Sequence, residues 1–396
     1  MNKERGPQGY IALIFLFVFI YGISKQAIGT LITPIIEHYG IKMAQAGLLS
    51  SFLSMGSFVA IFIITIFAGR VNKIILMGSS VFLYAVSLYY VSVAPRFGVL
   101  LASFALIGTF GSTVDTLTNS LLADLVPHNL GKKMSLMHGI YSLGGLCGPV
   151  AIERFSGVLN WAQVYFSISL VFFVFLIIYA AFAKWQWRLL AVRLSNEKQV
   201  RFGFPDIVKF FTRKRHVLLW FSLAFYSGNQ STMSIWIKRY VETHLNVAFW
   251  GAYALSAMWL GIAISRLLIS PNVKASSTRK ICVGNFISAI ALAVGLLSNS
   301  ARGIAAASLV VGLSSGLTIP LAVAICCEWH PGKTALGTLM PYTAMFISCV
   351  VFPPLSGLVS DFLGIAWGLG VSAACALLTA VFSGILDTNL KQSRES

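Results

Sequence analysis

Residues 124–149 read DLVPHNLGKKMSLMHGIYSLGGLCGP, and their marked positions recur at one constant distance further along the chain. For four acidic, basic or proline residues, adding 204 to the residue number leads to a like residue. The pairs related in this way are Asp124 and Glu328, Pro127 and Pro331, Pro149 and Pro353, and Arg70 and Lys274. A constant offset of this kind predicts that one structural unit is repeated, so that the protein has two homologous halves.

The composition places these halves in a membrane. Of 396 residues, 57% are hydrophobic and only 10% are charged, whereas a soluble domain carries about 25% charged residues. Apolar runs of about 20 residues are long enough to cross a hydrocarbon core of about 30 Å as helices. The sequence predicts an all-α membrane protein with twelve transmembrane helices. The expected spans are 10–38, 44–69, 74–94, 97–126, 134–157 and 160–184 in an N-terminal half (1–184), then 216–243, 247–270, 279–298, 302–328, 334–359 and 363–387 in a C-terminal half (216–396), joined by a basic linker (185–215).

The formal charge of +17 is distributed unevenly along the chain. If successive loops alternate between the two sides, 21 of the 29 Lys and Arg residues lie on the side of the termini. The positive-inside rule then predicts a cell-membrane protein with both termini and the linker in the cytoplasm. The charge therefore does not require a nucleic-acid partner. The run Arg213–Arg215 either fixes this topology or contacts anionic lipid headgroups.

Several classes of function are excluded by missing motifs. The six cysteines fall within predicted spans, and no Cys or His spacing is typical of a metal site. There is no phosphate-binding loop, and no nucleophile or acid/base pair that indicates an enzyme. We therefore expect no cofactor, and an ion gradient or the solute's own gradient as the energy source. Nothing marks a helix interface between copies, so we expect a monomer.

Two ionisable residues fall near the centre of predicted spans. Lys25 lies 15 residues into the first span and Asp115 lies 12 residues before Pro127, which places them about 22 Å and about 18 Å from the same membrane face. An ion pair between them is therefore available. Either protonation of Asp115 breaks this pair and couples proton binding to solute binding, or the pair is a fixed structural salt bridge.

Polar residues near this level predict a solute site. Asn119 follows Asp115 by one helical turn and shares its face. The polar run Tyr226–Thr232, which contains Asn229 and Gln230, also indicates an inward-facing surface. Trp236 lies seven residues after Asn229, where its ring either stacks against a sugar or packs in the core. We predict Asn119, Asn229, Gln230, Trp236 and Tyr226 as solute contacts.

Other marked residues have a mechanical interpretation. Gly148 and Pro149 permit close helix contact and a bend, so they either form a hinge or serve packing alone. Asp124, Arg266 and Glu328 fall near the cytoplasmic ends of their predicted spans. We expect them to close the inner mouth through salt bridges between helices.

These residues give the sequence a family resemblance. The segments that carry it are Gly108–Pro149, Tyr226–Trp236 and Met258–Arg266. In their order and spacing the chain resembles the fucose:proton symporter branch of the major facilitator superfamily, and in particular its bacterial glucose/mannose:proton symporters. That resemblance implies that Asp115 serves proton coupling and sugar contact.

The chain departs from that pattern at two places. Gln230 replaces an acid of the branch, and it cannot take up a proton. The segment Gly69–Lys73 lacks the aspartate usual between the second and third spans. Together with the central Lys25, these departures leave open a sugar acid or another anion as the solute.

Three functions remain as alternatives. The first is proton-coupled symport of a monosaccharide or related small polar solute by alternating access. The second is proton-driven efflux of drugs or small metabolites, which the Gly-Pro pair in the fifth span favours. The third is a sensor or scaffold, which the short linker disfavours.

Overall fold

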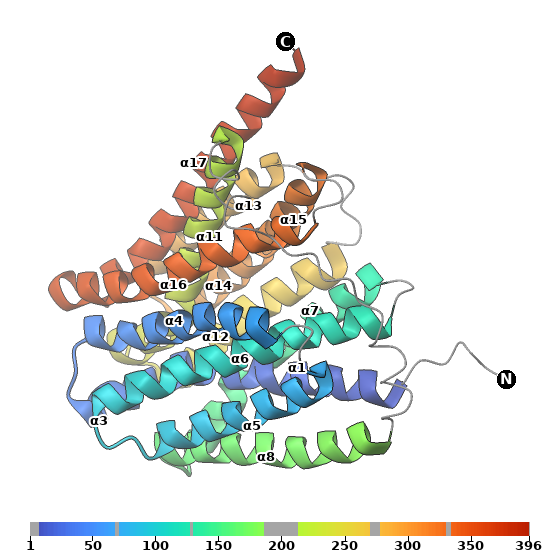
Figure 1. Cartoon of the computed structure of the whole chain (residues 1–396). Helices are drawn as coiled ribbons and strands as arrows, with labels where there is room; N and C mark the ends of the chain where they lie inside the picture. Colours follow the sequence, from blue (N-terminus) through green and yellow to red (C-terminus); the bar gives the residue numbers. More distant parts are fainter. Residues whose placement is uncertain are drawn as a thin grey trace. The chain divides into compact units, whose positions relative to one another are not determined.

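A computed structural model describes residues 8–67, 71–126, 130–185, 213–269, 278–329 and 334–395 of the chain. It consists of helices and short connections (Figure 1). Of the residues that carry the sequence repeat, Arg70, Pro127, Lys274 and Pro331 lie outside the described ranges, as does most of the predicted linker. The described residues form two compact units, of which one contains 1–27 and 52–200 and the other 28–51 and 201–396.

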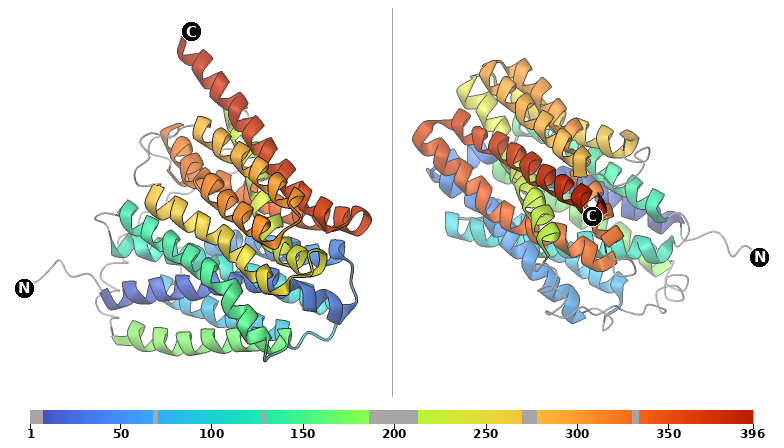
Figure 2. Two further views of the ribbon diagram at one scale, coloured as in Figure 1. Left: turned by 180° about the vertical axis from the view of Figure 1, so that it is seen from behind. Right: turned by 90° about the horizontal axis from the view of Figure 1, so that it is seen from above.

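The first unit is a bundle of long helices. They are α1 (Gln8–Lys25), the later part of α4 (Met43–Phe67), α5 (Lys73–Ser92), α6 (Phe97–Leu125), α7 (Leu130–Ser156) and α8 (Trp161–Trp185). In this bundle α5 packs beside both α6 and α8, and α1 packs beside α7 (Figures 1 and 2). The start of α5 is capped by Asn72, whose side chain accepts a hydrogen bond from the Ile74 N–H.

The second unit contains the remaining elements, two of which are π-helices. They are α2 (Ala27–Thr30), α3 (Ile32–Tyr39), the first part of α4, α11 (Lys214–Arg239), the π-helix η1 (Tyr240–His244), α12 (Ala248–Ile264), the π-helix η2 (Ser265–Ile269), α13 (Thr278–Leu297), α14 (Ala301–Ser315), α15 (Thr318–Trp329), α16 (Thr334–Leu363) and α17 (Ile365–Glu395). Within the unit α11 packs against α16 and α17, and α12 packs against α14. The first residue of α2, Ala27, belongs to the first unit.

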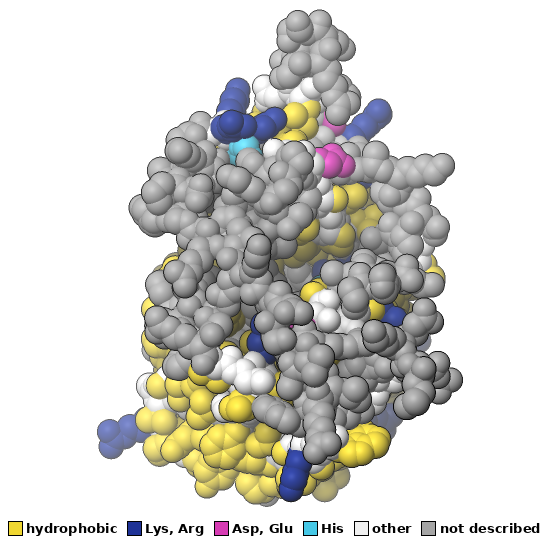
Figure 3. Space-filling model, turned by 45° about the vertical axis from the view of Figure 1, so that its right-hand side comes forward, with side chains coloured by type: hydrophobic (Ala, Val, Ile, Leu, Met, Phe, Trp, Pro, Cys, Tyr) yellow, Lys and Arg dark blue, Asp and Glu magenta, His cyan; other side chains and the backbone are white. Residues whose placement is uncertain are grey.

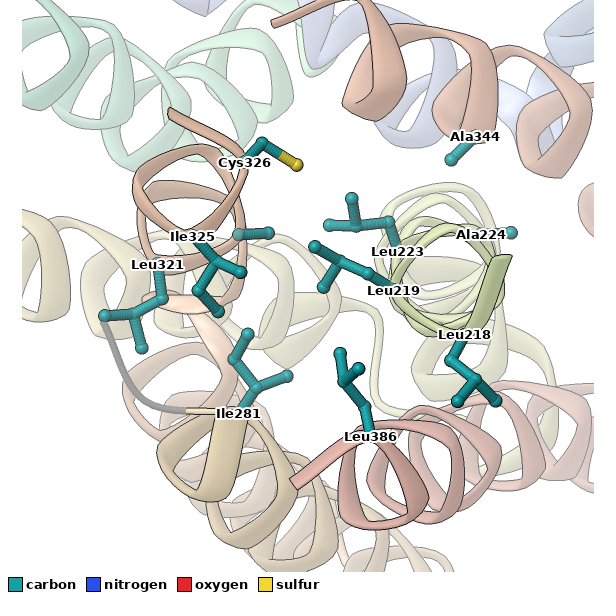
Figure 4. Packing of buried hydrophobic residues seen from close by; sticks show 11 residues of the cluster. Leu218, Leu219, Leu223, Ala224, Ile281, Leu321, Ile325, Cys326, Ala344 and Leu386 are labelled. Carbon is teal, nitrogen blue, oxygen red and sulfur yellow. The ribbon is translucent and has the colours of Figure 1, made fainter. Parts of the chain in front are cut away.

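An apolar core holds α11, α13, α15 and α17 together in this second unit. Leu219 and Leu223 of α11 face Ile281 of α13, Ile325 of α15 and Leu386 of α17 (Figure 4). Each of these side chains is buried. Inside a bilayer such side chains stabilise the helix contacts through close packing rather than through removal from water, so this cluster fixes the position of α11, which carries several predicted site residues.

Within the described ranges, ten helices are long and apolar enough to cross a membrane. They correspond to ten of the twelve predicted spans. The other two, 134–157 and 216–243, coincide with α7 and α11, which have 27 and 26 residues but contain polar stretches. The prediction of a multi-pass helical membrane protein is therefore confirmed, while the count of twelve and the division into halves at 1–184 and 216–396 stay predictions.

The outward faces of these helices suit a bilayer. Val171, Val174 and Ile177 of α8 are exposed, and apolar side chains cover a broad area in Figure 3. In a membrane such side chains contact lipid rather than water. The polar residues that remain inside the units are thus the candidates for function.

Candidate functional site

Lys25 lies where the first membrane helix is interrupted. It is the last residue of α1, and the next N–H, that of Gln26, donates to the Ile23 carbonyl at 3.0 Å in a tighter turn. The chain then enters the short helix α2. A cation at the C-terminal end of a helix is favoured by the helix dipole. The half-buried ammonium also lies 5.3 Å from the centre of the Tyr21 ring, which adds a cation–π contact.

The structure brings the predicted acid to this lysine. Asp115 lies in α6 and is half-buried. Its carboxyl group and the Lys25 ammonium act on each other electrostatically. The two ionisable residues singled out in the sequence thus share one site within the first unit, while a direct ion pair between them stays a prediction.

Asn119 also lies beside this site, but its amide is partly engaged. Its Nδ2 donates to the main-chain carbonyl of Asp115 at 2.8 Å. The side-chain oxygen of Asn119 accepts none of the hydrogen bonds found in the described part of the chain. Asn119 can therefore offer one acceptor to a solute, and its role in solute binding stays a prediction.

Two buried tyrosines support Lys25 and were missed by sequence reasoning. The rings of Tyr21 and Tyr84 meet edge to face at 5.5 Å between centres, and the Tyr84 hydroxyl shares a 2.8 Å hydrogen bond with Ser24. Gly111 makes room for both, because a Cβ there would lie 2.9 Å from each tyrosine. The sequence spacing could have indicated this packing. Tyr21 lies one helical turn before Lys25, and Gly111 lies one turn before Asp115.

The predicted hinge residues contact the same helix interruption. A Cβ on Gly148 would come within 2.9 Å of the Gln26 side chain and 3.0 Å of the Ile23 carbonyl oxygen. Pro149 follows inside α7. Gly148 thus lets α7 approach the end of α1 closely, and the choice between a hinge and packing alone stays open. A hinge movement at this point stays a prediction.

In the second unit Asn229 is buried, and both the oxygen and the nitrogen of its amide make hydrogen bonds. The Ser372 hydroxyl of α17 donates to Asn229 Oδ1 at 2.5 Å, and Asn229 Nδ2 donates to the Ser288 hydroxyl of α13 at 3.4 Å. The asparagine thereby connects α11 with two neighbouring helices. Its neighbour Gln230 is half-buried, so of the two amides Gln230 is the more accessible to a solute.

A ring that stacks against a solute must be accessible, whereas the ring of Trp236 is buried. Its side chain is 0% exposed, and its indole N–H donates to the Pro353 carbonyl at 3.2 Å. This arrangement holds α11 against α16. Contact between Trp236 and a solute would need a rearrangement of this packing, and its role in binding stays a prediction.

The residues expected at the cytoplasmic ends of spans have distinct surroundings. Asp124 of α6 forms a 2.9 Å salt bridge with Lys73 of α5, which connects adjacent helices of the first unit. Glu328 is exposed near the end of α15. Arg266 lies in η2, and its Nε donates to the Gly316 carbonyl at 3.4 Å. Closure of an inner mouth by these residues stays a prediction.

A second set of polar contacts was not foreseen. Segment 28–51 precedes most of the first unit in the chain, yet it belongs to the second unit. There the Thr33 hydroxyl donates to Glu242 at 2.8 Å, and Glu242 also pairs with the buried Lys238. Asp361 accepts hydrogen bonds from the N–H groups of Met43 and Ala44 at 2.9 Å each. These contacts attach the segment to η1, α11 and α16.

Among the residues that the structure describes, no group of three His, Cys, Asp or Glu side chains could hold a metal ion. The site chemistry consists instead of single charges, amides and hydroxyls inside membrane helices. Such groups can bind a polar solute and exchange a proton.

Known proteins share this fold. A peptide transporter POT has a TM-score of 0.79 at 13% identity, over 99% of this chain and 96% of its own. A POT family transporter in complex with 5-aminolevulinic acid has a TM-score of 0.78 at 12% identity, over 98% of both chains. A bacterial homolog of the human lysosomal transporter Spinster, solved in an inward-facing and occupied conformation, has a TM-score of 0.71 at 14% identity, again over 98% of both chains.

Sequence comparison agrees with the fold. The protein "Bypass of stop codon protein 6" of Saccharomyces cerevisiae is 24% identical over an alignment of 284 residues, and the match covers 65% of this chain and 56% of the yeast protein. The family model of the Major Facilitator Superfamily matches residues 14–281, more than half of the chain. The protein thus belongs to the major facilitator superfamily, and it is a transporter rather than an enzyme.

Proposed function

We propose that this protein is a proton-coupled secondary transporter that imports a monosaccharide or a related small polar solute by alternating access. The observation that carries the proposal is that Lys25, at the interruption of the first membrane helix, and Asp115, in α6 of the same unit, lie within range for their charges to act on each other. Charged groups are rare inside membrane helices and usually mark ion or substrate pathways. Here one of the two charges can be removed by a proton.

The coupling follows from the charge of the pair. With Asp115 ionised, Lys25 has a negative partner and the two charges offset each other. When Asp115 takes up a proton, Lys25 keeps its contact with the Tyr21 ring but loses the negative charge that offset its own, which favours a new partner. A solute or a changed helix arrangement can supply it, so proton binding and solute binding become linked.

The solute class is supported by polar groups inside each unit. In the first unit Asn119 offers an amide beside Asp115. In the second unit Gln230 and Tyr226 offer an amide and a hydroxyl, and Asn229 holds their helix in place. The resemblance of Gly108–Pro149 to the fucose:proton symporter branch supports a sugar-sized solute. The bound 5-aminolevulinic acid of the POT family transporter supports small polar solutes for this fold in general.

Uptake into proteoliposomes with an imposed inward proton gradient tests the proposal. The labelled probes are D-glucose and D-glucuronate. Asp115→Asn should abolish gradient-driven accumulation while leaving exchange of labelled for unlabelled solute largely intact, because the variant retains the shape of the site and loses only the proton. The matched control is Glu153→Gln, another acid-to-amide change, in α7. Loss of both accumulation and exchange in folded Asp115→Asn would overturn the coupling role.

Proton-driven efflux of drugs or small metabolites is the second candidate. It is favoured by Pro149, which follows Gly148 inside α7 and lies close to the interruption of α1. Under the same inward proton gradient, an exporter would show no accumulation of either probe and would expel a preloaded fluorescent amphipathic compound from the lumen as protons enter. The direction in which the solute moves relative to the proton therefore separates the two candidates.

The proposed setting is the cell membrane, with both termini in the cytoplasm, a protein that acts as a monomer, and twelve spans in halves 1–184 and 216–396. The basic residues on the side of the termini support this orientation. Labelling of single cysteines placed near either terminus from one side of intact cells tests it.

A further inference from the structure

Arg266 is a membrane-embedded cation without an acidic partner among the residues that the structure describes. It falls within the candidate span Ala248–Leu268 and is half-buried. Its recorded hydrogen bond, from Nε to the Gly316 carbonyl, is long at 3.4 Å. An ionised group inside a membrane helix normally faces a polar cavity and has a partner of opposite charge. The guanidinium of Arg266 therefore retains donors for an anion.

The backbone around Arg266 has an unusual form. Residues Ser265–Ile269 form the π-helix η2, which directly continues α12. Single π-helical turns within helices are frequent at functional sites. The Ser265 hydroxyl is buried and makes no hydrogen bond in the described part of the chain. This turn thus places one charged and one neutral donor next to each other in sequence.

A third donor comes from α11. The Tyr226 side chain is 1% exposed. The Arg266 side chain acts on its hydroxyl through its charge and as a hydrogen-bond donor. A guanidinium accepts no hydrogen bond, and no acceptor for the phenolic O–H is found within the described ranges, which is costly for a buried hydroxyl. A guanidinium and a phenol that approach each other in this way can both donate to one oxyanion.

We propose that Arg266 and Tyr226 bind the carboxylate of the transported solute, so that the solute is a small polar monocarboxylate such as a sugar acid rather than a neutral sugar. This inference rests on the proposed function and specifies its solute. The planar guanidinium matches a carboxylate with two parallel hydrogen bonds. Tyr226 can donate a further hydrogen bond to the carboxylate, which only accepts. A neutral sugar hydroxyl does not require this additional donor.

The charge inside the membrane helices favours a single negative charge. Lys25 acts on Asp115 in the first unit, whereas Arg266 has no carboxylate within ion-pair distance among the described residues. One carboxylate offsets the charge of Arg266. A dianion such as a phosphate ester would leave excess negative charge in a medium of low dielectric constant, which is unfavourable.

Equilibrium binding to the full-length protein in nanodiscs tests this inference, with labelled D-glucuronate as the probe and D-glucose and D-glucuronate as competitors. The two sugars have similar size and differ in the carboxylate. We expect glucuronate to compete at least tenfold more strongly than glucose, because an unpaired guanidinium rejects the neutral sugar. Equal competition by the two sugars, or no binding of glucuronate to folded protein, overturns the inference.

Three variants sharpen the test. Arg266→Gln should abolish the preference for glucuronate, and Tyr226→Phe should weaken glucuronate binding several-fold without weakening glucose binding. Arg302→Gln is the matched control, because Arg302 is exposed near the start of α14, and it should keep the preference. If Arg266→Gln does not fold, the near-isosteric Tyr226→Phe decides. An unchanged preference in Tyr226→Phe would then overturn the inference.

This experiment separates the inference from the proposed coupling. Binding at equilibrium needs no proton gradient. A preference for glucuronate in the binding assay, together with a lack of gradient-driven uptake, would support the solute class and contradict proton coupling. Gradient-driven uptake of glucose that glucuronate does not inhibit supports the coupling and overturns the carboxylate site.

Discussion

The Lys73 ammonium lies 2.9 Å from the Asp124 carboxylate and connects the first residue of α5 to the end of α6. The Lys73 ammonium also donates to the Ser120 hydroxyl at 2.9 Å. The Asp124 side chain is only 7% exposed, so water screens this pair less than a surface salt bridge. The contact lies within one unit and therefore acts first on the stability of that unit.

Asp124→Asn should lower the stability of the protein by about 1 to 3 kcal/mol, because a partly buried ammonium loses its charged partner. Thermal unfolding in detergent measures the loss. In a double-mutant cycle with Lys73→Gln, the coupling between the two positions should be at least about 0.5 kcal/mol. Additive effects of the two substitutions would show that the pair contributes nothing of its own.

Gly108→Ala should destabilise the first unit. A Cβ on Gly108 would lie 1.8 Å from the Leu53 carbonyl oxygen, and neither backbone can yield without shifting a whole helix. Overpacking of this kind costs about 1 to 3 kcal/mol. The measurement is the midpoint of thermal unfolding.

Gly98 provides the matched control on the same helix, because a Cβ there meets nothing within 4 Å. Gly98→Ala should leave the midpoint unchanged or raise it, since alanine favours a helix by up to about 1 kcal/mol over glycine. If Gly108→Ala and Gly98→Ala change the unfolding midpoint equally, close contact between α4 and α6 does not limit the stability of the first unit.

Trp236→Phe should reduce stability and leave the solute KM nearly unchanged. The substitution removes the hydrogen bond to the Pro353 carbonyl, which contributes about 0.5 to 1.5 kcal/mol. Trp367→Phe, on an exposed residue of α17, should change neither quantity. A large rise in KM with unchanged stability would instead favour the stacking of Trp236 on the solute.

Glu242→Gln should loosen segment 28–51. Lys238 is 4% exposed, and removal of one member of a buried ion pair costs about 3 to 5 kcal/mol. Hydrogen exchange measured on peptides from residues 28–51 should become faster. Thr33→Val, which removes the 2.8 Å hydrogen bond to Glu242 and keeps the ion pair, should produce a smaller effect. Exchange that is equal to that of the wild type in Glu242→Gln would show that other contacts hold the segment.

The sequence by itself determined the class of the protein and the positions of its helices. Hydrophobic runs are local features, and a run of about 20 apolar residues has few alternatives to a membrane-spanning helix. Lys25 and Asp115 could be found in the same way, because an ionisable residue inside such a run is conspicuous wherever the helix packs. Their similar depth follows from the rise of 1.5 Å per residue.

Only the tertiary structure decided which polar groups meet. The rotation of each helix about its axis and its register against its neighbours depend on close contacts such as Gly108 against Leu53, which no local pattern encodes. The sequence therefore could not decide whether Trp236 stacks on a solute or packs in the core. It also did not indicate that the charge of Arg266 acts on the Tyr226 hydroxyl. Nor did it indicate that segment 28–51 makes hydrogen bonds to Glu242 and Asp361, within the compact second unit. Contacts between residues 200 or more positions apart, such as Thr33 with Glu242, depend on how the helices pack and cannot be derived from a local pattern.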